Sequence, residues 1–228
     1  MSRPLLSSTI AKSPSRVGLA AQALERLEEM IVTHQLEPGS TWSEGALASL
    51  TGFGRTPVRE ALKRLENQHL VEIVQRHGVL ITDLNVHKQL LLLETRRELE
   101  RLVASLAARR RTKEESAQFL IYAQALRTAG KNDDVIAFFR AHRRSEALAI
   151  QASRNPFLAH AIAPCHAMSR RFYFLHYRSA NDLRLACEHH ALVMDAIITG
   201  EDKVAIKAAD SLLDYVENLT RAALSTDL

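Results

Sequence analysis

The stretch from residue 43 to residue 78 limits the possible folds of this chain more than any other. Ser43 is suited to cap a short helix, because the apolar residues after it recur at helical spacing. Gly52 follows at the position where a helix commonly ends in a left-handed residue. A second short helix begins within about four residues, and two helices joined by so short a turn are typical of a helix-turn-helix.

The second helix separates an apolar side from a basic side. We expect Thr56 to cap it, with Gly54 as the poorer choice, and Pro57 to take its first position. The apolar side carries four residues at helical spacing: Val58, Ala61, Leu62 and Leu65. The opposite side carries Thr56, Arg59 and Lys63. This division predicts a recognition helix that packs by its back and reaches DNA by its front; the alternative is a surface helix with solvated charges.

Two short runs rich in β-branched residues follow the second helix. They cover residues 70–74 and 79–82, and residues 75–78 join them. Gly78 is able to supply the positive φ that a tight turn often needs. We predict that this hairpin is the wing of a winged helix-turn-helix, and that a helix over residues 17–35 precedes the motif.

The remaining chain shows helical patterns and no convincing strand. Six helices are expected, over residues 87–110, 113–128, 133–152, 156–177, 181–199 and 201–224, with Asn85 as a cap for the first. Pro164 should kink or split the fourth of them. The predicted fold is mainly α, with a winged helix-turn-helix before an all-helical bundle. The predicted domains are a flexible arm (1–15), the winged helix-turn-helix (16–82), a linker (83–86) and the helical domain (87–224).

Composition places the chain among soluble globular proteins. Of its 228 residues, 46% are hydrophobic and 25% are charged, no apolar run approaches the roughly 18 residues of a membrane span, and no secretory signal is visible. We therefore expect a cytoplasmic protein without membrane contact. The net charge of +4 is no signal for nucleic acid, because nine basic residues balance nine acidic ones in residues 1–84. The two cysteines, Cys165 and Cys187, are expected to be buried free thiols.

The helix-turn-helix region resembles the GntR family of bacterial transcription regulators. The resemblance lies in the run Gly52-Phe53-Gly54-Arg55-Thr56-Pro57-Val58-Arg59-Glu60-Ala61-Leu62 and in the preceding Glu44-x-x-Leu47-Ala48. It implies that Arg55, Thr56 and Arg59 contact DNA, and that His77 and Gly78 enter the minor groove at the wing tip. Lys63 is suited to phosphate. Gly54 stands where the family usually has Ser, and Gly45 where many members have a basic residue, which implies altered phosphate anchoring.

The second half resembles the FCD ligand-binding domain of the FadR-like branch of that family. Three motifs carry the resemblance: Glu94-x-Arg96-x-x-Leu99-Glu100, Ala152-Ser153-Arg154-Asn155-Pro156, and His190 followed by Asp195-Ala196-Ile197-x-x-Gly200. The resemblance implies a small-molecule effector, often a carboxylate, and dimerisation. Arg96 matches an arginine that faces the effector cavity, and a guanidinium fork suits a carboxylate. The alternative for Arg96 is a pair with Glu100, four residues along the same helix.

Many FCD domains also hold a divalent metal with one Asp and three His. The resemblance carries these four positions onto His142, Glu146, His190 and Leu212, so this chain departs from the pattern at three of them. His142, Glu146 and His190 can still bind zinc, nickel, iron or manganese with water in the open position. The alternative is that Glu146 pairs with an arginine and that the histidines are ordinary residues of the pocket or surface.

These features predict a ligand-responsive bacterial transcription regulator. As the resemblance implies, a homodimer, acting as a repressor, binds a near-palindromic operator in double-stranded DNA, and an effector changes the placement of its two heads. One alternative is a metal-dependent enzyme in which His142, Glu146 and His190 activate water. No familiar catalytic motif supports it, and we expect no enzyme. The other alternative is a constitutive DNA-binding dimer without an effector.

Overall fold

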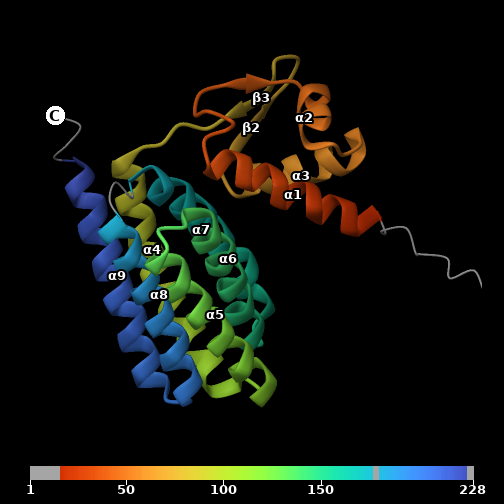
Figure 1. The fold of residues 1–228 in the computed structure, drawn as a ribbon. Coiled ribbons are helices and arrows are strands. Elements are labelled where there is room, and N and C mark those ends of the chain that lie inside the picture. The colour runs from red at the N-terminus through yellow and green to blue at the C-terminus, as the bar shows by residue number, and fades with distance from the viewer. Residues whose placement is uncertain (1–15, 177–179, 225–228) are drawn as a thin grey trace, which may run out of the picture.

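A computed structural model describes residues 16–176 and 180–224 of the chain. A small head of mixed structure stands on one end of a larger helical bundle, and the first helix, α1, lies between them (Figure 1). The arm expected over residues 1–15 lies outside the described residues. The two parts are connected by an extended segment that leaves the head after its last strand and enters the bundle at α4 (Figure 1).

The head contains three helices and a small sheet. Its elements in chain order are α1 (Arg16–Val32), β1 (Thr41–Trp42), α2 (Glu44–Thr51), α3 (Arg55–Asn67), β2 (Val71–Val74) and β3 (Gly78–Ile81). The strands are antiparallel in the order β1-β3-β2, and Val71 pairs with Ile81 while Thr41 pairs with Leu80. This arrangement is a winged helix-turn-helix, in which α2 and α3 are the two helices of the motif and β2–β3 is the wing.

The caps of α2 agree with the sequence expectation, whereas the cap of α3 does not. The Ser43 hydroxyl accepts a hydrogen bond from the Ala46 N–H at 3.0 Å, and Gly52 ends α2 at a φ of 76°. Gly54, in an extended conformation and without a side-chain hydrogen bond, is the N-cap of α3, so the expectation that Thr56 caps this helix was wrong. Because the helix begins at Arg55, the Arg55 and Thr56 side chains belong to its first turn.

The apolar side of α3 belongs to the hydrophobic core of the head. Val58, Ala61, Leu62 and Leu65 are all buried, as their helical spacing predicts. They pack in one core with Leu27 and Ile31 of α1 and with the buried residues of the sheet. The helix α1 packs against α3 and also contacts α7 of the bundle, so α3 is connected to the helical domain through α1.

The wing has a third strand that sequence reasoning missed. β1 covers only two residues, too short to produce an alternating pattern, and it lies beside β3. Gly78 begins β3 at a φ of 102°, and a Cβ atom there would lie 2.5 Å from the Trp42 carbonyl oxygen of β1. The glycine is therefore required where two strands approach each other, and not at the tip of the turn.

The helical domain contains six helices in the described part of the chain. They are α4 (Val86–Arg110), α5 (Lys113–Lys131), α6 (Val135–Ala152), α7 (Pro156–His176), α8 (Ala180–Thr199) and α9 (Asp202–Leu224). Asn85 caps α4 by accepting the Lys88 N–H at 2.9 Å. The helix α4 packs against α9, α5 packs against α8, and α6 and α7 lie on the side nearest to α1 (Figure 1). The predicted mainly α fold is confirmed.

Pro164 lies inside α7 without splitting it. The helix is continuous from Pro156 to His176, so of the two expected effects of Pro164, a kink or a split, the split does not occur. A proline removes one backbone hydrogen bond, but α7 is buried along much of its length against α4, α6 and the head. Packing over so many residues outweighs one lost bond. Cys165 and Cys187 are buried free thiols, as expected. None of the described helices is long and apolar enough to span a membrane.

Candidate functional site

The front of α3 presents the residues that the sequence assigned to DNA. Arg55, Thr56, Arg59 and Lys63 are all exposed, on the side of the helix opposite its buried face. Their polar groups can therefore approach a duplex without any rearrangement of the core. The structure contains no nucleic acid, so their contacts with bases and phosphates stay predictions.

Arg59 is held by a carboxylate of the neighbouring helix. Its Nη2 lies 2.7 Å from Glu44 Oε2, and its Nε donates a second hydrogen bond to the same oxygen at 3.0 Å. This hydrogen bond lowers the pKa of Glu44. The side chain of Arg59 remains 58% exposed, so Glu44 orients the guanidinium without removing it from the surface.

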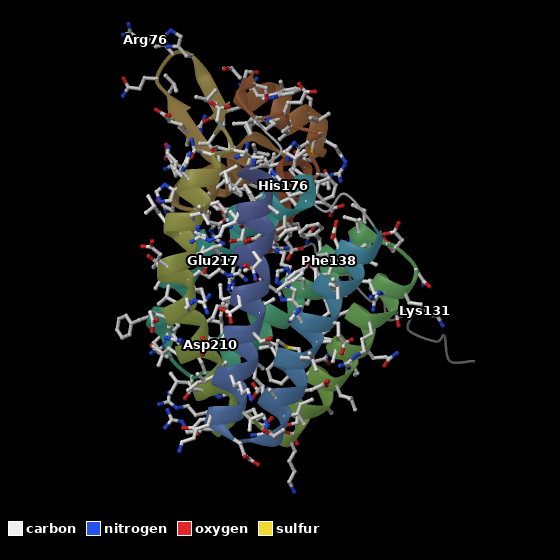
Figure 2. All side chains as sticks on the ribbon, turned by 90° about the vertical axis from the view of Figure 1, so that its left-hand side faces the viewer. Arg76, Lys131, Phe138, His176, Asp210 and Glu217 are labelled. Carbon is white, nitrogen blue, oxygen red and sulfur yellow. The ribbon has the colours of Figure 1, made fainter. Side chains whose placement is uncertain are left out.

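The wing tip is made of residues 75–77. Arg76 adopts a left-handed φ of 65°, and Figure 2 shows it at the outer end of the β2–β3 hairpin, pointing away from the bundle. His77 is exposed beside it, and its Nδ1 lies 2.9 Å from the Gln75 carbonyl oxygen. Gly78 is only partly exposed because it lies against β1. Of the two wing residues predicted from sequence, His77 is thus the more accessible.

A second candidate site lies inside the helical domain. Five of the six bundle helices enclose a cavity of about 20 Å³. Its polar lining is unusually dense in charge: Arg96, Glu100, His142, Ser145, Glu146, His166 and His190. A cavity of this volume has room for about one water molecule or one ion. The four positions implied by the resemblance to FCD domains all line it, including the apolar Leu212.

Glu146 is the centre of this cluster. His142 Nε2 lies 3.0 Å from Glu146 Oε1, and His166 Nδ1 lies 3.4 Å from the same oxygen. The other oxygen, Oε2, accepts a hydrogen bond from Arg170. Burial acts to raise the pKa of Glu146, but His142, His166 and Arg170 outweigh it and hold that pKa well below its usual value. The alternative suggested by the sequence, a pair between Glu146 and an arginine, is therefore present.

Arg96 faces the cavity and also pairs along its own helix. It is 1% exposed, and its Nη2 lies 3.0 Å from Glu100 Oε1 and 3.8 Å from Glu146 Oε1. The pair with Glu100 that the sequence offered as the alternative is thus present, and effector binding by Arg96 stays a prediction. Burial raises the pKa of Glu100, but His166 and Arg96 hold it at about 2, so this carboxylate is ionised.

His190 occupies the apolar side of the cavity. Its ring lies 3.9 Å from the ring of His142, centroid to centroid, and 5.8 Å from that of Phe138. Burial lowers the pKa of His142, and it lowers the pKa of His190 further, with the charge on His142 as the next cause. Burial therefore favours the uncharged form of both rings.

Several buried polar atoms around the cavity form no hydrogen bond of regular geometry among the described residues, although most of them form close ion pairs. They are Glu146 Oε1, both ring nitrogens of His142 and Arg96 Nη2. Buried polar atoms in folded proteins are nearly always satisfied by protein or by a bound species. The small cavity beside these atoms has room for about one water molecule.

The structure adds three residues to the site that sequence reasoning missed. Glu100 was considered only as a partner of Arg96, and His166 was given no role in the site. Arg170 was not distinguished from the other arginines near the end of the same helix, one of which was expected to line the pocket. His166 Nε2 lies 2.9 Å from Glu100 Oε1. These residues come from α4 and α7, and no spacing within the sequence connects them to His142 and Glu146 on α6.

The arginine pair of α7 joins the cavity to the head. Arg170 donates hydrogen bonds both to Glu146 in the cavity and to Glu28 on α1, and it is 8% exposed. Arg143 adds a second contact to Glu28 at 3.2 Å. The next residue of α7, Arg171, donates to the hydroxyl and the carbonyl oxygen of Thr82, just after the wing. Adjacent residues of α7 therefore hold the first helix and the last strand of the head.

Comparison with known proteins agrees with both halves of this description. Residues 19–81 match the model of the bacterial regulatory proteins of the gntR family, and residues 91–215 match the model of the FCD domain. The chain belongs to the GntR family, in its FadR-like branch. It is a transcription regulator and not an enzyme, because the gntR family consists of regulatory proteins and the relatives are HTH-type transcriptional regulators.

The relatives differ in how much of the chain they cover. An HTH-type transcriptional regulator of Streptomyces ambofaciens is 39% identical over 57 residues, which are 25% of this chain and 24% of that protein. One from Agrobacterium vitis is 32% identical over 80 residues, or 35% of this chain and 47% of that protein. The regulator Mce2R of Mycobacterium tuberculosis is 26% identical over 92% of this chain and 95% of its own length.

Solved structures show the same fold. E. coli McbR/YncC superposes with a TM-score of 0.77 at 19% identity, over 90% of this chain and 98% of that one. A putative GntR transcriptional regulator from Rhodococcus sp. RHA1 gives a TM-score of 0.67 at 16% identity, also over 90% and 98%. The head and the bundle thus form a combination found in other regulators, while the cluster around Glu146 has to be interpreted from this chain's own residues.

Proposed function

We propose that this regulator is a ligand-responsive repressor that binds a near-palindromic operator as a homodimer. Two recognition helices, one from each protomer, would enter successive major grooves of the DNA. A small-molecule effector would bind in the helical domain and change the relative placement of the heads. Such coupling requires that the effector bind the two arrangements of the dimer with different affinity.

In this proposal the α3 front reads the operator. Arg55 and Arg59 contact base edges, where an arginine fork fits guanine, and Thr56 and Lys63 contact phosphates. His77 and the neighbouring Gly78 approach the minor groove from the wing. The exposure of Arg55, Thr56, Arg59 and Lys63 on one face of α3 supports this assignment.

The bridge made by Arg170 is the observation that carries the regulatory part of the proposal. One buried guanidinium bonds to Glu146 in the cavity and to Glu28 on α1 of the head. Guanidinium groups stay charged and bind carboxylates with a fixed geometry. Any occupant of the cavity that repositions Glu146 therefore changes the hydrogen bonds that fix α1 relative to the bundle.

The size of the cavity determines how an effector would enter. About 20 Å³ is too small for an organic acid, so a carboxylate effector has to open the cavity by displacing side chains. Arg96 is the natural anchor for its carboxylate, because an incoming anion can replace Glu100 as the partner of the guanidinium. A protein that never opens this cavity would instead be a constitutive DNA-binding dimer.

The test measures the affinity of the protein for DNA fragments that flank the regulator's own gene. Fluorescence anisotropy at constant salt gives this affinity. We expect Arg59→Ala to weaken binding to the preferred fragment at least about fivefold, since a good bidentate contact discriminates by about 1–3 kcal/mol. Lys207→Ala is the matched control, because Lys207 is an exposed cation on α9, which begins at the end of the bundle away from the head (Figure 1).

Two outcomes would contradict the proposal. If no fragment is preferred and no non-specific DNA is retained at low salt, the chain is not a DNA-binding regulator of this kind. If the Arg59→Ala and Lys207→Ala variants lose affinity equally, the front of α3 is not the reading surface. A carboxylate panel that never changes operator affinity would favour the constitutive dimer.

A further inference from the structure

A second hollow of the molecule lies between the head and the bundle, outside the cavity around Glu146. Its volume is about 300 Å³, which is at the lower end of the range for sites that bind small molecules. One wall is the second half of α1, in the head, and the other wall is α6, in the bundle. The buried Arg170 of α7 lies at its inner end. We call this space the interdomain cleft.

The cleft is present because α1 and α6 face each other with long charged side chains. In the described part of the chain, α1 packs closely against α7 but not against α6. Each wall carries residues at i, i+3, i+4 and i+7 spacing, so one face of each helix lines the cleft. These residues are Glu25, Glu28, Glu29 and Val32 on α1, and Arg140, Arg143, Arg144 and Ala147 on α6. An acidic face thus lies opposite a basic face, and ion pairs join the two.

All three carboxylates of the cleft have partners. Glu25 and Glu29 each pair with an arginine of α6 at 2.9 Å. Glu28 is 4% exposed, and it pairs with both Arg143 and Arg170. The cleft therefore leaves no unpaired carboxylate for a cationic ligand.

Arg144 is the cation of the cleft that has no such partner. Its guanidinium makes no ion pair and no hydrogen bond among the described residues, whereas the neighbouring Arg140 and Arg143 both pair with carboxylates of α1. The side chain is exposed and lines the cleft. A guanidinium fork binds a carboxylate, sulfonate or phosphate group with two parallel hydrogen bonds. Arg144 is thus available to an anion without the loss of an existing ion pair.

The remainder of the lining offers apolar surface to the body of a ligand. Val32 is 4% exposed and Phe139 is 9% exposed, so both belong to the inner part of the cleft. The half-buried Ile136 and the exposed Ala147 continue this surface on α6. A ligand that removes apolar surface from water gains free energy in proportion to the area it covers. The cleft therefore favours a molecule with one charged end and one apolar end.

We propose that the interdomain cleft binds a small organic anion with an apolar body, held at its charged end by Arg144. This site goes beyond the effector site of the central cavity, because different residues line the two. Arg170 lies between them and bonds to Glu28 on the side of the cleft and to Glu146 on the side of the cavity. Since its walls belong to two domains, a ligand of the cleft stabilises the arrangement of head and bundle in which the cleft is present.

Fluorescence titration of the full-length protein with anilinonaphthalenesulfonate tests the proposal. This probe combines an aromatic body with one anionic group, and phenylnaphthylamine has the same body without the sulfonate. We expect saturable binding of the sulfonate, and binding of the neutral probe that is at least about threefold weaker. Arg144→Gln should lose about threefold to tenfold in affinity for the sulfonate and keep its affinity for the neutral probe.

Two further variants locate the binding site. Arg109→Gln is the matched control, because Arg109 is an exposed arginine of α4 that does not line the cleft, and it should keep its affinity for both probes. Ala147→Phe adds a ring to the wall of the cleft and should weaken the binding of both probes. Circular dichroism verifies that each variant is folded, since such probes also bind partly unfolded chains. The surface variant Arg144→Gln provides the answer if Ala147→Phe does not fold.

Three results would overturn the proposal. Equal affinity for the two probes, or equal losses in Arg144→Gln and Arg109→Gln, would show that Arg144 does not hold an anion. Absence of saturable binding by the original protein would show that the cleft is not a site for ligands of this class. Binding that a folded Ala147→Phe variant leaves unchanged would place the probe elsewhere. The titration contains no DNA, so its outcome is independent of operator binding.

Discussion

A single surface arginine illustrates how residue-scale contacts prepare the reading surface. Arg59 is bonded to Glu44, so its guanidinium already has a defined direction before DNA arrives. An exposed pair of this kind contributes only about 0–1 kcal/mol to stability. If α3 binds DNA as proposed, the importance of this pair lies in orienting Arg59, and it would cost some affinity because Glu44 would bring a negative charge close to the phosphates.

Replacing Glu44 with Gln should separate these two effects. We expect tighter binding to unrelated DNA, because a charge that repels phosphates is removed. We also expect the ratio of operator to non-specific affinity to fall about threefold to tenfold, because Arg59 loses its strongest orienting contact. Fluorescence anisotropy with both kinds of DNA at one salt concentration gives the ratio.

Glu72→Gln is the control for the charge change alone. Glu72 is exposed on β2 of the wing, and the partner of Arg59 is Glu44. This variant should bind unrelated DNA somewhat more tightly while its affinity ratio stays close to that of the original protein. An unchanged ratio in Glu44→Gln would show that Glu44 does not direct Arg59.

At the scale of elements, α7 connects more parts of the molecule than its sequence suggests. It contributes Ala167 to the core of the head, Arg170 to both the cavity and α1, and Arg171 to the end of the wing. Periodicity identifies α7 as a helix from residue 156 onward. The five consecutive residues that end at Tyr173 are all buried, so α7 is buried on more than one face. For a helix that is buried on several sides, the sequence does not predict which neighbouring element each polar side chain will contact.

Arg170→Lys should weaken the connection between the two domains. A lysine keeps the charge but lacks the fork that bonds Glu28 and Glu146 together, so at least one charged hydrogen bond is lost. We expect the free energy of unfolding to fall by about 2 kcal/mol, measured by urea denaturation. We also expect operator affinity to become insensitive to ligands of the cavity.

The matching surface substitution is Arg140→Lys. Arg140 pairs with Glu29 of α1 at 2.9 Å, but 61% of its side chain is exposed. Its replacement should cost less than about 1 kcal/mol and leave the ligand response intact. Equal losses in the two variants would mean that the buried bridge has no special role in coupling.

For the molecule as a whole, the buried histidines set a dependence of stability on pH. His142 and His190 have lowered pKa values in the folded protein, mainly because of burial, whereas the unfolded chain titrates near 6.5. Below this value the unfolded state binds more protons than the folded state. Their contribution to stability is therefore present above pH 6.5 and is lost as the pH falls toward the folded pKa values.

We predict that the free energy of unfolding decreases between neutral pH and about pH 5, by up to about 1.4 kcal/mol per pH unit for each of these histidines. Urea denaturation at several pH values, with a chelator present, measures the slope. His190→Asn should reduce it, whereas His160→Asn should not, because His160 is exposed on α7. A slope that is the same in all three proteins would show that His190 is not buried as a neutral ring.

The sequence by itself determined the elements and the order of the two domains. The signals that predicted them are local: helical spacing, the caps Ser43 and Asn85, and Gly52. Such signals depend on residues close in sequence, so they can be read without knowing which elements pack against them. The amphipathic α3 is the clearest case, since its buried face follows from spacing alone.

Only the tertiary structure decided what surrounds each buried charge. The strand β1 exists because β3 lies beside it, and Gly78 is needed because Trp42 approaches it. Glu100 and His166 meet Glu146 because α4, α6 and α7 pack together, over separations along the chain of 46 and 20 residues that no motif spans. The free energy of a buried charge depends on all the groups around it, and those groups are chosen by packing rather than by proximity in sequence.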